Sequence, residues 1–313
     1  MHEDQSYKNV THPSVLITGG SGLAGRYLTS LLLEHGYRVA HLSRRISQFG
    51  TVRVFRWNPE KKILDPVVFD GIDYVIHLAG ANTGDSRWTV ERKKEIVSSR
   101  VESAMLLHKV ITENKITIKA FISASAVGYY GAVTSDNIFN ENDPPSSDFM
   151  GTVGKLWEDS ADLFQRSGIR TVKIRTSLIL EKTNNALTKM LMTGKLGFLV
   201  RAGSGKQYLP WIHITDLCNI YLKAIEDETM NGPYNAVSPQ YTTHNEFVNE
   251  LGRLLNKKVM TVPSFTVSVM FGEMSDVVLH GSRISSKKLI DSGYVYVFND
   301  LHKALEDIFS DHI

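Results

Sequence analysis

The chain has too little cysteine to rely on disulfide bonds. Cys218 is the single cysteine among 313 residues, so no disulfide can form within the chain. Small secreted domains commonly need such bonds, whereas a chain of this length buries a sizeable core without them. The cysteine content therefore favours an intracellular protein, and we expect a cytoplasmic location.

Metal motifs, excess charge and long apolar runs are also missing. The eleven histidines form neither a Cys/His cluster nor an HExxH motif, so we expect no metal site. Lys and Arg total 35 against 33 Asp and Glu, a balance that argues against nucleic acid as a partner and against a polybasic membrane anchor. No apolar run approaches the ~20 residues of a membrane-spanning helix. These absences leave an enzyme or a binding protein for a small molecule.

The first part of the chain alternates between strand-like and helix-like segments. Gly36 ends the first helical segment, where glycine is common. Alternating strands and helices indicate a parallel sheet with right-handed crossovers, and so a doubly wound α/β fold of the Rossmann type. Apolar runs predict strands at 14–18, 38–42, 73–78, 119–123 and 170–174, and helical spacing predicts helices at 23–35, 88–113 and 151–167.

The pattern changes after about residue 180, where glycines cluster and the predicted elements become shorter. Helices are expected at 216–226 and 245–255, with a short strand at 233–235 between them. We therefore predict a smaller C-terminal α/β lobe that packs over the ends of the sheet strands and binds substrate. The expected domains are a flexible tail at 1–12, a cofactor-binding domain at 13–180 and the substrate lobe at 181–313.

A glycine-rich turn joins the first predicted strand to the first predicted helix. Gly19, Gly22 and Gly25 have a GxxGxxG spacing, which allows a tight turn, close approach of a pyrophosphate and close packing of helix on strand. With Ser21 and Leu23 they are candidates to bind phosphates at the free N–H groups of the helix. The alternative is a turn with a purely structural role.

The end of the second predicted strand bears on the choice of cofactor. An NAD site would place Asp or Glu there, whereas this chain has Ser43, Arg44 and Arg45, and Arg26 follows the last glycine of the turn. Guanidinium groups suit a 2′-phosphate, so we predict NADP(H) as cofactor, with Arg44 as the leading contact. The alternative is that these arginines are ordinary surface charges.

Later segments, in order, resemble the extended short-chain dehydrogenase/reductases, the group that includes sugar-nucleotide epimerases. Leu78-Ala79-Gly80 resembles the turn that forms the floor of their cofactor site, and Ser123 begins a segment similar to their serine-rich one. The resemblance is closer to the branch known as epimerase family or atypical short-chain reductases, and it spans about 15–308. It is carried by RWT (87–89), SSR (98–100), SASAVGYYG (123–131), FxxxxxKxWE (149–158), RTSLIL (175–180), GSGKQYLPWIHITD (203–216) and GPYNAVSP (232–239).

This resemblance implies a C-terminal domain of unknown function at about 260–310. Most members of the larger family use a Tyr-x-x-x-Lys pair, in which the Lys lowers the pKa of the Tyr that exchanges a proton with substrate. None of the twelve tyrosines here has Lys four residues later, and Lys155 is preceded at that spacing by Gly151. The usual acid/base tyrosine is therefore absent.

Four residues remain as catalytic candidates. Ser125 corresponds to the family's strand-end serine, which holds the substrate oxygen, and Lys155 is on the expected helix. Tyr129 or Tyr130 could donate the proton, or both could only line the pocket.

The resemblance also suggests contacts to cofactor and substrate. Glu95 and Arg100 are expected to contact the cofactor, unless they form a surface ion pair. The backbone near Ile179 is expected beside the nicotinamide. His213 and Asp216 fit a structural role better, with Asp216 as a helix N-cap. Candidates for substrate specificity are Lys206, Gln207, Tyr208 and Trp211.

Two functions fit these residues. The first is an NADP(H)-dependent oxidoreductase or epimerase acting on a small polar carbonyl or hydroxyl compound. The second is an NADP(H)-binding regulatory or partner-binding protein that has lost turnover. Family members often dimerise through helices equivalent to 88–113 and 151–167, which suggests a homodimer.

Overall fold

In the computed structural model, the described residues are 12–45, 50, 52–183 and 185–310. The predicted tail therefore lies, apart from His12, outside the described residues. Among those described, no helix is long and apolar enough to cross a membrane.

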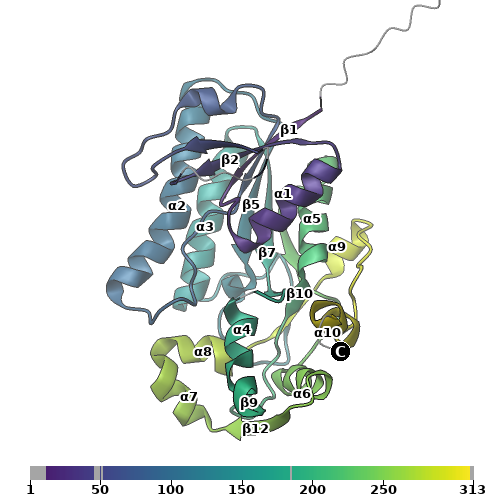
Figure 1. The fold of residues 1–313 in the computed structure, drawn as a ribbon. Helices are drawn as coiled ribbons and strands as arrows, with labels where there is room; N and C mark the ends of the chain where they lie inside the picture. The colour runs from purple at the N-terminus through teal and green to yellow at the C-terminus, as the bar shows by residue number, and fades with distance from the viewer. Residues whose placement is uncertain (1–11, 46–49, 51, 184, 311–313) are drawn as a thin grey trace, which may run out of the picture.

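A seven-stranded parallel sheet forms the centre of the larger part of the molecule (Figure 1). Its strand order is β11-β7-β5-β4-β1-β2-β3, and neighbouring strands pair in parallel throughout. This sheet confirms the predicted Rossmann-type α/β fold. The strands are β1 (Ser14–Thr18), β2 (Arg38–Ser43), β3 (Arg53–Arg56), β4 (Tyr74–His77), β5 (Ala120–Ala126), β7 (Arg170–Thr176) and β11 (Gly232–Ala236).

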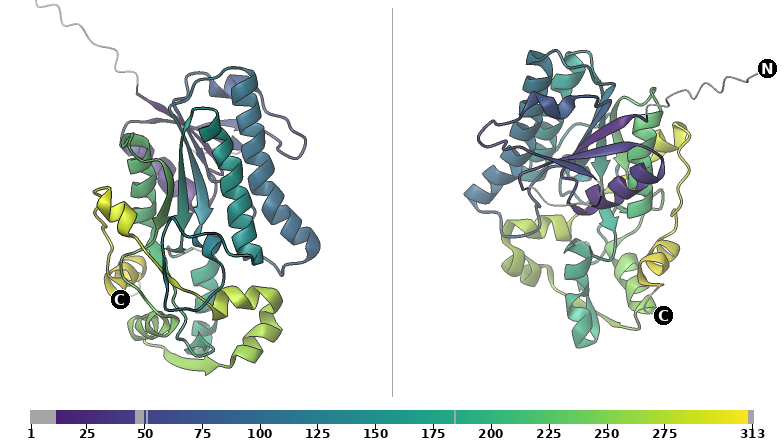
Figure 2. Two further views of the ribbon diagram at one scale, coloured as in Figure 1. Left: turned by 180° about the vertical axis from the view of Figure 1, so that it is seen from behind. Right: turned by 45° about the horizontal axis from the view of Figure 1, so that its top comes forward.

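Helices cover both faces of the sheet (Figure 2). One face packs against α1 (Leu23–Glu34) and α5 (Ile214–Glu226), and the other against α2 (Val90–Glu113) and α3 (Phe149–Arg166). On β1, Val15 and Ile17 belong to the core beneath α1 and α5, whereas Leu16 belongs to the core beneath α2 and α3. This alternation is what a strand buried on both faces requires.

Several of the remaining elements form a smaller lobe below the carboxyl ends of the strands (Figure 1). Its core contains Trp211, Phe247 and Leu305. The elements outside the main sheet layers are β8 (Leu178–Leu180), α4 (Asn185–Leu191), β9 (Phe198–Ala202), β10 (Trp211–His213), α6 (His244–Leu254), β12 (Lys258–Val262), α7 (Ser264–Phe271), α8 (Ser275–Leu279), α9 (Lys287–Asp291) and α10 (Leu301–Phe309), with the two-residue strands β6 (Ile138–Phe139) and β13 (Arg283–Ile284) and the 3-10 helices η1 (Pro66–Phe69), η2 (Val127–Tyr130), η3 (Met192–Leu196) and η4 (Gly272–Met274).

The predicted division at residue 180 needs one amendment. Both α5 and β11 follow residue 180, yet they belong to the layers of the main sheet, where β11 is the strand beyond β7. The chain therefore leaves the sheet after β7, builds part of the smaller lobe, returns to complete the sheet, and leaves again.

Candidate functional site

Two glycines of the turn after β1, Gly19 and Gly25, stand where a side chain would collide with backbone. A Cβ atom at Gly25 would lie 2.5 Å from the carbonyl oxygen of Gly19, and one at Gly19 would lie 3.0 Å from the backbone of the β4 turn. Gly19 also has φ +73°, and Gly22 caps α1 without a side-chain hydrogen bond. Ser21 is exposed and Leu23 half-buried. The turn thus brings the free N–H groups of α1 to an open edge, as phosphate binding requires.

The turn after β4 packs directly against this glycine turn. The amides of Leu78 and Ala79 donate to Thr18, the first to its carbonyl at 3.1 Å and the second to its hydroxyl at 3.2 Å. Thr18 is the last residue of β1. The two turns therefore form one continuous surface at the carboxyl edge of the sheet, which is where dinucleotides bind in this fold.

Arg100 supports the β4 turn from inside the protein. Its Nη1 donates to the carbonyls of Ala81 and Ile96, both at 2.9 Å, and its guanidinium lies 4.7 Å from the Trp157 ring centre. A Cβ at Gly80 would lie 3.0 Å from this guanidinium. Burial lowers the pKa of Arg100 to about 10. Arg100 thus shapes the floor of the site, and its direct contact with cofactor stays a prediction.

Glu95 lies on the same helix but in a different environment. Its carboxylate pairs with Arg92 at 2.6 Å, and its side chain is 54% exposed. This matches the alternative of a surface ion pair.

A cationic edge lies beside the glycine turn. Arg26 and Arg44 are exposed, and no hydrogen bond or ion pair ties their guanidinium groups to the described residues. Ser43 ends β2 and accepts a hydrogen bond from the amide of Arg45 at 3.2 Å. Both arginines are therefore available to an anionic ligand.

His41 supports the glycine turn and was not predicted as a site residue. A Cβ at Gly20 would lie 2.5 Å from its ring, and its Nε2 lies 2.8 Å from the Thr29 hydroxyl. Burial lowers the pKa of His41, so the ring is neutral at pH 7. The sequence feature that could have indicated this role is a polar residue at an inward-facing position of β2.

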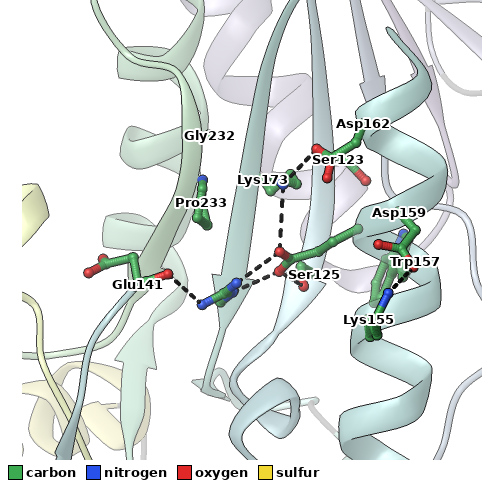
Figure 3. Close-up of polar contacts among 12 residues, drawn as sticks. Ser123, Ser125, Glu141, Lys155, Trp157, Asp159, Asp162, Lys173, Gly232 and Pro233 are labelled. Atoms are coloured by element: carbon green, nitrogen blue, oxygen red, sulfur yellow. Dashed lines mark hydrogen bonds and ion pairs between the residues drawn. The ribbon is translucent and has the colours of Figure 1, made fainter. Parts of the chain in front are cut away.

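Ser125 belongs to a buried polar cluster between β5, β7 and α3. Its hydroxyl donates to Glu158 at 2.8 Å, and Arg175 donates to the same carboxylate through Nε at 2.7 Å and Nη2 at 2.9 Å. Figure 3 shows Ser125 among these contacts, with Ser123 and Lys173 near the next turn of α3. Burial alone would lower the pKa of Arg175, but the Glu158 carboxylate outweighs it and raises that pKa. The cluster is therefore a buried ion pair that orients Ser125.

Tyr130 is part of the same cluster. Its hydroxyl accepts a hydrogen bond from Arg175 Nη1 at 2.7 Å and donates to Asn235 Oδ1 at 2.8 Å. Burial raises the pKa of this phenol, and its side chain is fully enclosed. Since its proton is committed to Asn235, Tyr130 is poorly placed to protonate a substrate.

Tyr129 has a freer hydroxyl. It is half-buried, and the Arg175 guanidinium stacks 3.6 Å from its ring centre. Burial raises the pKa of Tyr129, while the charges of Arg175 and Lys155 lower it. A Cβ at Gly154 would lie 3.0 Å from Tyr129 Cα, so that glycine lets η2 approach α3.

The structure explains why α3 carries glycine where the family has tyrosine. A Cβ at Gly151 would lie 2.2 Å from the carbonyl oxygen of Ser146. Lys155, one turn further along, has a 55% exposed side chain and pairs with Asp159 (Figure 3). This hydrogen bond raises the pKa of Lys155. Lys155 and Ser125 therefore do not meet in this arrangement.

Two predicted specificity residues are structural instead. Trp211 is fully buried and donates to the Thr242 hydroxyl at 3.0 Å, and the amide of Gln207 donates to the carbonyls of Ala202 and Val278. Both were predicted from a glycine-rich setting that turns out to be packed. Lys206 is exposed. Tyr208 is half-buried and lines a small cavity with Arg283.

The predicted N-cap of α5 was the wrong residue. His213 is the N-cap and accepts from the Thr215 amide at 3.3 Å. Asp216 lies in the first turn of α5 and accepts from the Tyr294 hydroxyl and from the amides of Val297 and Phe298. Asp216 therefore anchors a distant C-terminal segment, which no local pattern reveals.

Ser123 and Ile179 lie on different strands. Ser123 is buried on β5, and its hydroxyl donates to the carbonyl of Ala124 at 2.9 Å. Ile179 is on β8 opposite Ile212 of β10 and packs against the core under α5.

Of the residues that sequence reasoning missed, Glu158 and Arg175 are the most central. Glu158 lies on the buried stripe of α3 with Gly154 and Ala161, and that periodicity was the available signal.

Known proteins resemble this chain over most of its length. The family model described as NAD dependent epimerase/dehydratase matches residues 15–236, and a domain of unknown function, DUF1731, matches residues 262–308. The epimerase family protein SDR39U1 of Mus musculus is 34% identical over 94% of this chain and 99% of its own length. Epimerase family protein ML0860 of Mycobacterium leprae is 31% identical, covering 93% and 94%.

A solved structure of a relative contains a cofactor. The crystal structure of human epimerase family protein SDR39U1 (isoform 2) with NADPH has a TM-score of 0.84 and 30% sequence identity, and the match covers 96% of this chain and all of that chain. These matches confirm the family that the motifs suggested: the chain belongs to the NAD-dependent epimerase/dehydratase family of short-chain dehydrogenase/reductase fold.

Proposed function

We propose that the protein is an NADP(H)-dependent oxidoreductase or epimerase that acts on a small polar carbonyl or hydroxyl compound. The observation that carries the cofactor choice is the pair of exposed arginines, Arg26 and Arg44, beside the glycine turn. They occupy the region where an NAD site needs a carboxylate for the ribose 2′-hydroxyl. The NADPH bound in the human relative supports the same choice.

The residues present fit a dinucleotide. A Cβ at Gly19 or Gly25 would collide with neighbouring backbone, so these glycines let the turn pack tightly, and its backbone N–H groups at the start of α1 can hold the pyrophosphate. Arg26 and Arg44 hold the 2′-phosphate, and the Leu78–Gly80 turn forms the floor. When bound, the nicotinamide supplies hydride chemistry, and the protein supplies position and charge.

Tyr129 is the proton donor in this proposal. Its hydroxyl is not bound to Asn235 as that of Tyr130 is, and burial raises its pKa, although the charges of Arg175 and Lys155 oppose that shift, so the phenol keeps its proton until a substrate takes it. Ser125 donates its own proton to Glu158, which leaves its lone pairs to accept a hydrogen bond; because it is 2% exposed, contact with a substrate hydroxyl requires the pocket wall around it to open. Lys155 would break its exposed pair with Asp159 to reach the ribose.

The second candidate is a cofactor-binding protein without turnover. It is favoured by one observation: glycine stands at position 151, with no space for a side chain, while Ser125 and Tyr130 are held inside a buried cluster. The two candidates predict the same cofactor and differ only in turnover.

The cofactor is tested by titrating NADPH and NADH into wild type and Arg44→Glu. We expect NADPH affinity to fall at least about tenfold, since a hydrogen bond to a charged group contributes roughly 1.5–3 kcal/mol. NADH affinity should change little. Arg166→Glu makes the same charge change on the last turn of α3 and is the control. Equal NADPH affinity in Arg44→Glu and wild type would rule Arg44 out.

Turnover is tested by following NADPH oxidation with a panel of carbonyl compounds. If one compound is reduced, Tyr129→Phe should slow the reaction by about a hundredfold or more, the size expected for loss of a general acid. Tyr130→Phe should leave more activity. If no compound oxidises bound NADPH, although all variants bind it, the second candidate is the better account.

We also propose a homodimer formed through α2 and α3. Met105 on α2 is 50% exposed and Leu156 on α3 is 37% exposed, so both helices present apolar side chains to solvent. Light scattering should give twice the mass of the 35.1 kDa chain, and Met105→Glu should return the protein to the monomer. A monomeric wild type at working concentrations contradicts this proposal.

A further inference from the structure

The segment 81–84, which directly follows the floor turn, has an unusual set of hydrogen bonds. Each of its four carbonyls accepts from a side chain. Arg100 binds the carbonyl of Ala81 and Trp88 binds that of Thr83, both at 2.9 Å, while Arg92 and Lys189 bind the carbonyls of Asn82 and Gly84. The position of this loop therefore depends on side chains from outside it.

One of these side chains comes from the smaller lobe, and two further contacts cross the same boundary. Lys189 is on α4. Arg87 Nη2 donates to the carbonyls of Met270 at 2.9 Å and Val269 at 3.2 Å, at the end of α7. Lys93, near the start of α2, pairs with Glu273 of η4 at 2.6 Å. Figure 1 shows α4, α7 and α8 below the first turns of α2.

These three contacts are suited to opening and closing. The side chains of Lys93 and Glu273 are 30% and 49% exposed, and exposed ion pairs contribute little individually. Arg87 satisfies carbonyls that a helix end leaves without partners. Lys93 also lies 4.9 Å from the Phe149 ring centre, so it links α2, η4 and the start of α3. Contacts of this kind can be broken individually at a small cost in free energy.

We propose that α7, η4 and α8 (residues 264–279), together with α4, form a cover that retains NADP(H), and that Arg87, Lys93 and Lys189 are its latch. This inference rests on the proposed cofactor binding. Lys189 joins the cover to the 81–84 loop that continues the cofactor floor, and Arg87 and Lys93 join it to the segment that follows, so in the closed state the cofactor floor and the smaller lobe are tied together. The domain of unknown function thereby acquires a role: it sets how long the cofactor stays bound.

The test is the rate at which NADPH leaves the full-length chain, followed by fluorescence after mixing with excess NADP⁺. Lys93→Gln and Glu273→Gln should each speed release about two- to fivefold, as expected for loss of an exposed ion pair. The double variant should release NADPH no faster than the faster single one. Higher salt should speed release from wild type and have less effect on the double variant.

The design separates the latch from general electrostatics. Cofactor is an anion, so if only the surface potential mattered, Lys93→Gln and Glu273→Gln would change release in opposite directions. The matched control is Lys109→Gln, because Lys109 pairs with Glu113 on the same helix without crossing to the smaller lobe. It should release NADPH at the wild-type rate.

Three results overturn the proposal in different ways. If both variants release NADPH at the wild-type rate but melt at a lower temperature, the contacts only dock the two lobes. If their release rates change in opposite directions, the effect is electrostatic. If wild type itself does not bind NADPH, the proposed function fails, and the cover fails with it.

Discussion

The phosphate turn leaves no space for a side chain at Gly25. A single added Cβ would meet Gly19 O at 2.5 Å and Gly20 Cα at 2.6 Å, and both are backbone atoms that cannot move aside alone. Gly194 in the smaller lobe is the opposite case, because a Cβ there meets only a leucine methyl at 3.5 Å.

We therefore predict that Gly25→Ala weakens both folding and cofactor binding. Forcing an extra methyl into a packed site costs about 1–3 kcal/mol, which urea unfolding can measure. NADPH titration should show a matching loss of affinity. Gly194→Ala is the control and should behave as wild type, since its Cβ makes only an ordinary contact. Wild-type affinity in Gly25→Ala would contradict the packing argument.

Buried histidines make stability depend on pH. His77 is fully enclosed between Thr18 and Ser103, at 2.8 and 3.1 Å, and burial lowers its pKa to about 4. Burial also lowers the pKa of His244 to about 4. Between about pH 4 and pH 6.5, the unfolded chain, whose histidine pKa is near 6.5, therefore binds more protons than the folded chain. Stability is complete above about pH 6.5 and falls as the pH drops toward 4.

For His77 alone, the loss of stability between pH 7 and pH 5 should be about 2 kcal/mol. His77→Gln should therefore show a smaller pH dependence of urea unfolding than wild type, even if it is less stable at pH 7. His35→Gln, at an exposed position on the end of α1, should keep the wild-type slope. An unchanged slope in His77→Gln would mean that this ring is not the titrating group.

At the residue scale, the sequence was informative where backbone shape decides the role. The spacing of Gly19, Gly22 and Gly25 identified the turn because glycine is needed there for steric reasons. The roles of Tyr130 and Gln207 could not be read in this way, because their partners are distant in the chain: Asn235 for the first, and Val278 for the second.

At the scale of elements, a buried ion pair joins α3 to β7. Glu158 and Arg175 are 5% and 2% exposed, so each carries a charge that water does not stabilise. Their pairing also orients Ser125 and stacks against Tyr129. Stability and the geometry of the candidate catalytic groups therefore depend on the same two residues.

Glu158→Gln should lower the free energy of unfolding by about 3 kcal/mol, since it leaves a buried guanidinium without its counter-charge. Guanidinium-chloride unfolding provides the measurement. Glu113→Gln makes the same change in an exposed pair on α2 and should cost less than about 1 kcal/mol. A similar small cost for both variants would show that the buried pair is replaceable.

Element boundaries were predicted well where apolar residues mark them. The strand at 14–18 matches β1, and the helix at 23–35 exceeds α1 by one residue. The missed strand β3 is RVFR, at the edge of the sheet, with arginine at both ends. An edge strand has one open side and needs fewer apolar residues, so its sequence pattern is weak.

On the scale of the whole molecule, the C-terminal segment is joined to the sheet layers through Asp216. This fully buried carboxylate accepts from the Tyr294 hydroxyl at 2.7 Å and from the amides of Val297 and Phe298 at 2.8 and 2.9 Å. Helix α10 then packs into the core of the smaller lobe. The contact joins positions some eighty residues apart, which explains why sequence patterns did not reveal it.

Asp216→Asn should loosen this segment while the larger part stays folded. Hydrogen exchange should rise in residues 294–309, and the free energy of unfolding should fall by at least about 1.5 kcal/mol, the lower value for one hydrogen bond to a charged group. Asp276→Asn, at a 61% exposed side chain of α8, is the control. Uniform protection in both variants would show that Asp216 does not anchor the segment.

Because β11 lies far along the chain from its partner β7, the order of synthesis on the ribosome matters for this sheet. The larger sheet is complete only when residue 236 has emerged, because β11 pairs with β7 across all of the chain that builds β8, β9 and β10. Until then one side of β7, with the sequence RTVKIRT, lacks its partner strand, and its free backbone groups can pair with another nascent chain. A pause in translation between residues 180 and 232 thus prolongs the time during which this edge of the sheet is unpaired.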